Sequence, residues 1–264
     1  MSSFLLMLVF VFCVQDVCFA GNVRVTREKR NFVAENNFYR INFSKTASIN
    51  EIIFKDSCKG IKSNYLSHDS LTLNSSKNFY LRENAIAEGS IKEISKTEKQ
   101  LVFRVSYPKT PSNVVADYVY TFYADKPIIK VDILMRQDKN TSWLLIRLNE
   151  FGINNGFFSD WAVGEDEKSG SLSKDTKDQK ATNWKKSYNW SALFTDESAL
   201  GIIGLDKNSQ SFIHIYGPKK QYINGKFSKW NSKEIALKQY LYIGPSYGGY
   251  KQVREWAQKL ASKK

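Results

Sequence analysis

Alternation of apolar and polar side chains is the feature of this sequence that most limits its fold. A β-strand turns successive side chains to opposite faces, so a period of two predicts strands with one buried face. Many such strands with little helix predict an all-β fold, a large antiparallel β-sandwich. The alternating positions are Tyr39, Ile41 and Phe43; Leu101, Phe103, Val105 and Tyr107; Tyr118, Tyr120 and Phe122; Ile129, Val131, Ile133 and Met135; Leu144, Ile146 and Leu148; Phe212, His214 and Tyr216; and Ile235, Leu237, Gln239, Leu241 and Ile243.

Turn residues separate these segments, and helical periodicity occurs only at the end of the chain. Val253, Trp256, Ala257 and Leu260 fall at i, i+3, i+4 and i+7, which predicts one C-terminal helix from Gln252 onward. We expect Trp256 to anchor this helix on the sheet. Turns are expected at Lys55-Asp56, 124–127, 206–208, Gly217-Pro218 and Asn224-Gly225.

The first twenty residues have the pattern of a secretory signal. The apolar run at 4–14 is shorter than the roughly 20 residues that a membrane-spanning helix needs, and 18–20 ends in a small residue suited to cleavage. The sequence therefore predicts a signal peptide at 1–20, a secreted or periplasmic protein and no stable membrane span. A buried N-terminal strand is the alternative. Residues 21–264 then form a single β-sandwich domain with Cys58 as its one cysteine.

A polar stretch at 165–186 has almost no apolar side chains and predicts a long loop. Long loops in compact domains are often functional, and a surface excursion is the alternative. Four carboxylates lie at its start. A pair of them could perform acid–base chemistry on a glycoside, whereas a solvated acidic run is the simpler interpretation. These residues are Asp160, Glu165, Asp166 and Glu167.

Aromatic residues gather around the same loop and predict a carbohydrate-binding face. Sugars pack on aromatic rings while nearby polar groups bind their hydroxyls. The alternative is that these rings seal the sheet beneath the loop. The candidate residues are Trp161, Trp184, Tyr188 and Trp190, with Asp160 beside them. Tyr247 and Tyr250, which flank Gly248-Gly249, are candidates for a separate sugar subsite, and a turn into the last helix is the alternative there.

His214 and Tyr216 share one face of a predicted strand and are the candidate catalytic pair. A neutral imidazole can take a proton from the carbon beside a uronate carboxyl group, and a tyrosine can act as the acid, as in polysaccharide lyases. A histidine in the core or at the rim of the sandwich is the alternative.

The charge balance favours an anionic partner. The sequence has 39 Lys and Arg residues against 26 Asp and Glu residues, a formal net charge of +13. This surplus would attract an anionic polysaccharide or oligosaccharide. It would also attract nucleic acid, but the sequence has no recognised nucleic-acid-binding motif, and the predicted export argues against that partner. No spacing typical of a metal site and no phosphate-binding loop occurs, so neither a metal nor another cofactor is predicted.

The order of several segments resembles the galactose mutarotase-like superfamily. The segments 36–43 and 48–54 are similar to its opening hairpin, and 120–131 to its central hairpin. The segment 190–204 looks like the one that lines its concave face, and 242–250 like its final strand. The resemblance covers most of Val23 to Leu260 and implies a β-supersandwich with a carbohydrate ligand.

The resemblance does not imply one reaction, because one fold carries many functions. Epimerases of this superfamily use paired histidines and a glutamate, whereas this chain has only His68 and His214. His68 falls in Ser67-His68-Asp69, which is expected to be an exposed turn, so a mutarotase reaction is not predicted. Two hypotheses stay open: a polysaccharide lyase or other glycoside-processing enzyme, and a non-catalytic carbohydrate-binding or structural domain.

Overall fold

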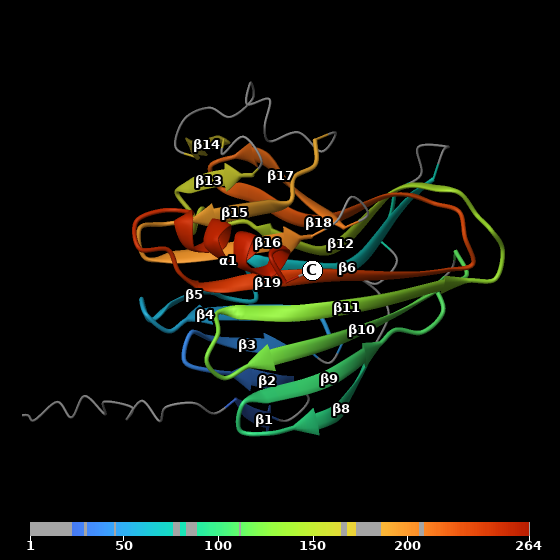
Figure 1. The fold of residues 1–264 in the computed structure, drawn as a ribbon, viewed down its shortest axis with the longest axis horizontal. Coiled ribbons are helices and arrows are strands. Elements are labelled where there is room, and N and C mark those ends of the chain that lie inside the picture. The colour runs from blue at the N-terminus through green and yellow to red at the C-terminus, as the bar shows by residue number, and fades with distance from the viewer. Residues whose placement is uncertain are drawn as a thin grey trace, which may run out of the picture.

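The computed structural model describes residues 23–28, 31–44, 46–75, 80–82, 89–110, 112–164, 168–172, 186–205 and 209–263. Within these ranges the strands form three antiparallel sheets, and α1 (Lys251–Ala261) is the one helix (Figure 1). The predicted all-β class with a C-terminal helix is confirmed. The predicted signal peptide, 1–20, lies outside the described residues.

One sheet has nine described strands and the other two have five each, and the strands of one five-stranded sheet follow chain order. In spatial order, sheet 1 consists of β1 (Arg24–Glu28), β2 (Asn31–Glu35), β3 (Tyr39–Phe43), β4 (Ile49–Phe54) and β5 (Lys59–Ile61). Sheet 2 consists of β14 (Lys168–Ser171), β13 (Asp160–Val163), β15 (Trp190–Phe194), β16 (Ser198–Gly204), β19 (Glu234–Pro245), β11 (Ile128–Gln137), β10 (Val114–Tyr123), β9 (Gln100–Ser106) and β8 (Ser90–Lys96). Sheet 3 consists of β17 (Gln210–Gly217), β18 (Lys220–Trp230), β12 (Trp143–Ile153), β6 (Leu66–Ser75) and β7 (Tyr80–Arg82).

Sheet 2 forms one layer of the sandwich, and sheets 1 and 3 lie side by side behind it (Figure 1). The main core contains buried side chains from all three sheets. Aromatic rings join sheet 1 to sheet 2: the ring of Phe43 lies 5.2 Å from that of Phe103 and 5.6 Å from that of Tyr120. Edge-to-face contacts of this kind add to the free energy gained by burying the rings. The alternation predicted for these strands therefore marks their core face.

The alternation fails at the start of β12, where the pattern predicts Leu144 in the core. A register shift between Trp143 and Leu145 interrupts the pairing with β6. Leu144 is 49% exposed, while Trp143 and Leu145 are buried. A bulge of this kind adds a residue to one strand and reverses which side chains face the core.

Asn224-Gly225 is not a turn, in contrast to the prediction, but lies within β18. A Cβ atom on Gly225 would lie 2.2 Å from Nε2 of Gln239, so the missing side chain makes room for this buried amide. Gln239 belongs to a polar chain through the core: the Tyr120 hydroxyl donates to Oδ1 of Asn149, and Nδ2 of Asn149 donates to Oε1 of Gln239, both at 3.2 Å. Tertiary packing therefore overrides the local turn signal.

His68 is also placed differently from the prediction. It is a buried residue of β6, not part of an exposed turn, and only 5% of its surface is accessible. Its ring packs on Phe151 at 4.6 Å, and its Nδ1 accepts a hydrogen bond from the backbone N–H of Ile49. The imidazole therefore links sheets 1 and 3 within the core.

The predicted loop at 165–186 is in part a strand. Lys168–Ser171 form β14, which pairs with β13 at the edge of sheet 2. Residues 165–167 and 173–185 lie outside the described part of the chain, and with them Glu165, Asp166, Glu167 and Trp184.

Helix α1 packs on the outer face of sheet 2 over β15 and β16 (Figure 1). Its buried residues are Val253 and Ala257, whereas Trp256, the predicted anchor, is only partly buried and carries the Lys259 ammonium 4.5 Å from its ring centre. Val253 reaches the sheet because Gly201 has no side chain: a Cβ there would lie 2.7 Å from Cγ1 of Val253.

Candidate functional site

The outward face of sheet 3 brings together the polar and aromatic side chains that are the strongest candidates for a site. On β17, Ile213 and Ile215 belong to the main core, so Phe212, His214 and Tyr216 point the other way. Antiparallel pairing places Tyr222 opposite His214 and Asn224 opposite Phe212. The same register places Arg147 of β12 opposite both Lys226 of β18 and Thr72 of β6. We call these eight side chains the sheet 3 face.

Three rings form one end of the sheet 3 face. The rings of His214 and Tyr216 lie 4.3 Å apart, and Tyr222 meets Tyr216 edge-on at 5.7 Å. Tyr216 is 65% exposed, and the Lys220 ammonium lies 5.4 Å from its ring centre. The predicted pair of His214 and Tyr216 is therefore brought together at a solvent-accessible aromatic patch.

Charged groups lie next to these rings. The guanidinium of Arg147 lies 5.6 Å from the ring centre of Phe212, and the ammonium of Lys226 lies 5.9 Å from it. Arg147 also donates to the buried carboxylate of Glu150 at 3.0 Å. Cations held against an aromatic ring keep a fixed position, which is suited to binding an anion.

Burial and positive charge set the protonation of the histidine. Burial, and then the charge of Arg147, lower the pKa of His214 below its usual value. Its imidazole is therefore neutral at pH 7 and can accept a proton. Burial also lowers the pKa of Lys226.

Two polar side chains of the sheet 3 face are buried without a partner. Both amide atoms of Asn224 and the hydroxyl of Thr72 make no hydrogen bond to any described residue. Asn224 is fully buried and Thr72 is 1% exposed. A buried polar group without a partner costs free energy, so these atoms are positions where a buried water would bind favourably.

The aromatic residues predicted to form a stacking platform do not lie together. Trp161 and Tyr188 are buried in the main core. Trp190 lies on the opposite side of sheet 2, below α1, where it stacks on Tyr250 at 5.6 Å. Trp161, Tyr188 and Trp190 each expose less than a tenth of their surface, so in this structure they pack the sheet and present no shared open face.

The other predicted site residues are dispersed. Asp160, at the start of β13, accepts a hydrogen bond from the Ser159 hydroxyl at 2.6 Å. Tyr247 is 74% exposed in the loop before α1 and has a positive φ of 50°. Neither residue lies on the sheet 3 face.

The sequence alone did not identify Arg147, Glu150, Tyr222, Asn224 and Lys226 as neighbours of His214. Three of them lie on β18, which pairs with β17, and the other two lie on β12, the next strand of the sheet. Asn224 was also misassigned to a turn. Every second residue of a strand points to the same face, so Tyr222, Asn224 and Lys226 share one face of β18. This spacing is the feature of the sequence that could have identified them.

Among the described residues, no group of three or more His, Cys, Asp or Glu residues is placed to hold a metal ion. Helix α1, with eleven residues, is too short to cross a bilayer, and it is the one helix in the described part of the chain.

Comparison with known proteins gives matches in structure but not in sequence. No protein-family model matches the chain, and no curated protein matches it significantly. An α-N-acetylgalactosaminidase from Bifidobacterium bifidum, in complex with GalNAc, has a TM-score of 0.62 at 10% identity, covering 86% of this chain and 38% of that one. An α-mannosidase from Enterococcus faecalis V583 has a TM-score of 0.58 at 8% identity, covering 92% of this chain and 32% of that one.

A third similar structure is the galactosidase domain of an α-galactosidase–sucrose kinase, with a TM-score of 0.55 at 9% identity, covering 86% of this chain and 42% of that one. The chain spans less than half the length of each of these three structures. At such low identity the likeness establishes the fold alone. The chain therefore has the β-supersandwich fold found in galactose mutarotase-like and glycoside hydrolase domains.

Proposed function

We propose that the sheet 3 face binds an anionic polysaccharide, and that the protein meets this ligand after export from the cell. The observation that carries the proposal is the grouping of exposed Tyr216 with Tyr222 and neutral His214, next to the cations Arg147 and Lys226. Aromatic rings bind the CH faces of sugars, and the cations bind carboxylates.

Two further observations support this ligand. The structures with a similar fold include an α-galactosidase domain, an α-mannosidase and an α-N-acetylgalactosaminidase, all named for reactions on sugars. The net charge of +13 favours an anionic glycan over a neutral one, and the signal pattern at 1–20 supports export.

The contact between His214 and Tyr216 supports a reaction, β-elimination at a uronate residue. Neutral His214 takes the proton from the carbon beside the carboxyl group while a cation of the face stabilises the developing charge. A carbon–carbon double bond forms as the neighbouring carbon–oxygen bond breaks. The departing oxygen takes a proton from the Tyr216 hydroxyl, and the phenolate then recovers a proton from His214.

The experiment measures binding and product on the same preparation. The chain from Gly21 to Lys264 is incubated with polygalacturonate and alginate, and with dextran as a neutral control. Retention on immobilised glycan reports binding, and the ultraviolet absorbance of an unsaturated sugar reports elimination. We expect retention and product with the uronate polymers, and neither with dextran.

Three variants separate the possible outcomes. His214→Ala and Tyr216→Phe should abolish product, and Tyr216→Phe should keep binding because the ring stays. Tyr247→Phe is the matched control, since it removes the hydroxyl of an exposed tyrosine that lies off the sheet 3 face. Retention without product would leave a non-catalytic binding domain. No retention on any polymer contradicts the proposal, and a loss caused by Tyr247→Phe instead would move the site to the loop before α1.

A further inference from the structure

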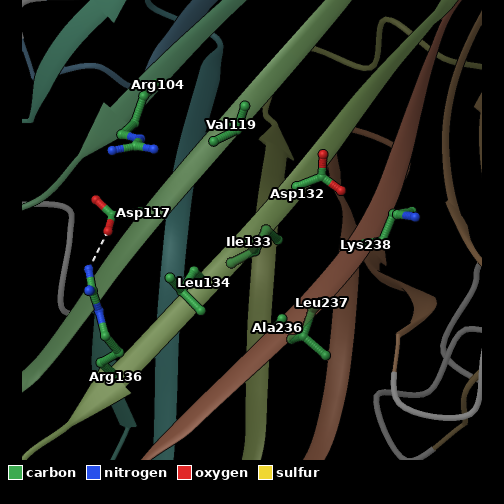
Figure 2. Close-up of a pocket in the computed structure, with 10 residues that line it drawn as sticks. All are labelled: Arg104, Asp117, Val119, Asp132, Ile133, Leu134, Arg136, Ala236, Leu237 and Lys238. Carbon is green, nitrogen blue, oxygen red and sulfur yellow. Dashed lines mark hydrogen bonds and ion pairs between the residues drawn. The ribbon is translucent and has the colours of Figure 1, made fainter. Parts of the chain in front are cut away.

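A second concave surface lies on the outer face of sheet 2, away from α1. It is a groove of about 500 Å³ over β9, β10, β11 and β19, within the size range of small-molecule sites (Figure 2). Helix α1 covers β15 and β16 instead. The sheet 3 face belongs to the other layer of the sandwich, so the two surfaces are separate.

The floor of this groove is aliphatic. Val119, Leu134 and Ala236 point outward from neighbouring strands, and each retains some solvent exposure. Leu134 is paired with Ala236 of β19 and with Asp117 of β10. Exposed positions of a sheet usually carry polar side chains, so an aliphatic strip in a hollow marks a contact surface.

Charged side chains lie at both ends of this floor. At one end Asp117 is the acidic residue, and it pairs with Arg136 (Figure 2). It also accepts a hydrogen bond from the Ser106 hydroxyl at 2.6 Å. Arg104 lies at the same end, and its guanidinium makes no hydrogen bond or ion pair with any described residue. Two guanidinium groups with one carboxylate leave this end positive.

The opposite end also has one more cation than carboxylate. Asp132 pairs with Lys130 at 2.6 Å and is the cross-strand neighbour of Lys238. Arg104 and Lys238 lie in one row across four strands, separated by three strand spacings, or about 14 Å. At one end of an aliphatic floor the groove therefore offers the Arg104 guanidinium, which has no partner among the described residues, and this fits an apolar molecule with a negative group at that end.

We propose that this groove binds a small molecule with one carboxylate on an aliphatic body. The Arg104 guanidinium holds the carboxylate through paired hydrogen bonds, as its fork of donors allows. Leu134 and Val119 contact the aliphatic body. A sugar is the poorer fit because no aromatic residue is among the described residues that line the groove.

The test titrates the whole chain with octanoate and follows binding by calorimetry. Octanol supplies the aliphatic body alone and acetate the carboxylate alone. We expect saturable binding of octanoate, and binding at least tenfold weaker for octanol and for acetate. Arg104→Gln should weaken octanoate binding about tenfold, since a hydrogen bond to a charged group is lost. Leu134→Asn, a substitution on the outer face, should weaken it as well.

Arg24→Gln is the matched control, because it removes the same charge from an exposed arginine of β1, outside the groove. It should leave octanoate binding unchanged. The proposal is overturned if octanoate does not bind, if octanol binds equally well, or if Arg104→Gln has no effect. It is also overturned if Arg104→Gln reduces retention on polygalacturonate, because the groove would then belong to a polysaccharide surface. Failure of the sheet 3 proposal alone would leave octanoate binding intact.

Discussion

His68 is a residue whose burial makes stability depend on pH. Burial lowers the pKa of His68 to about 4, against about 6.5 in the unfolded chain. Below pH 6.5 the unfolded state binds this proton more readily than the folded state, so the free energy of unfolding falls as the pH falls from about 6.5 to about 4. The shift corresponds to about 3 kcal/mol over that window.

The measurement compares His68→Gln with the wild type in urea unfolding at pH 7 and at several values down to pH 4. The substituted amide has no proton to gain in this range and keeps an acceptor for the N–H of Ile49. We expect the variant to lose about 3 kcal/mol less than the wild type between these limits. Equal losses would show that other groups cause the pH dependence.

At the scale of elements, the sequence predicts strands well where the pleat is regular and poorly where it is interrupted. The alternation of β10 and β11 matches their buried faces, because both strands pair with their neighbours without a register shift. Leu144 was misplaced because a bulge has no signature in the alternation itself. His214 and Tyr216 were found because they share one strand, whereas Arg147 and Lys226 join them only through cross-strand pairing.

The docking of α1 gives a prediction at this scale. Val253 is fully buried against Gly201, so Val253→Ala removes two methyl groups from a packed contact and leaves a cavity. We expect the free energy of unfolding to fall by about 2 kcal/mol. Glu255→Ala, at an exposed position of the same helix, should change it by less than about 0.5 kcal/mol. Urea unfolding of the wild type and the two variants at pH 7 measures both changes in the free energy of unfolding. Equal losses for the two variants would contradict the assignment of Val253 to the buried face of α1.

At the scale of the whole molecule, two kinds of electrostatic attraction act on an anionic glycan. The net charge of +13 acts over the Debye length, which shrinks from about 30 Å at 0.01 M salt to about 8 Å at 0.15 M. Contacts at Arg147 and Lys226 are local, and their partial burial makes salt screen them less. Added salt should therefore weaken retention on polygalacturonate without abolishing it.

Two substitutions with the same change in net charge separate these contributions. Lys226→Gln removes a cation of the sheet 3 face, whereas Lys92→Gln removes one from the exposed edge strand β8. At 0.15 M salt, where distant charges are largely screened, we expect Lys226→Gln to weaken binding roughly tenfold and Lys92→Gln to have little effect. Equal losses for the two variants would mean that net charge alone attracts the glycan. The sheet 3 face would then have no specific part in binding, even if retention on the polymer were strong.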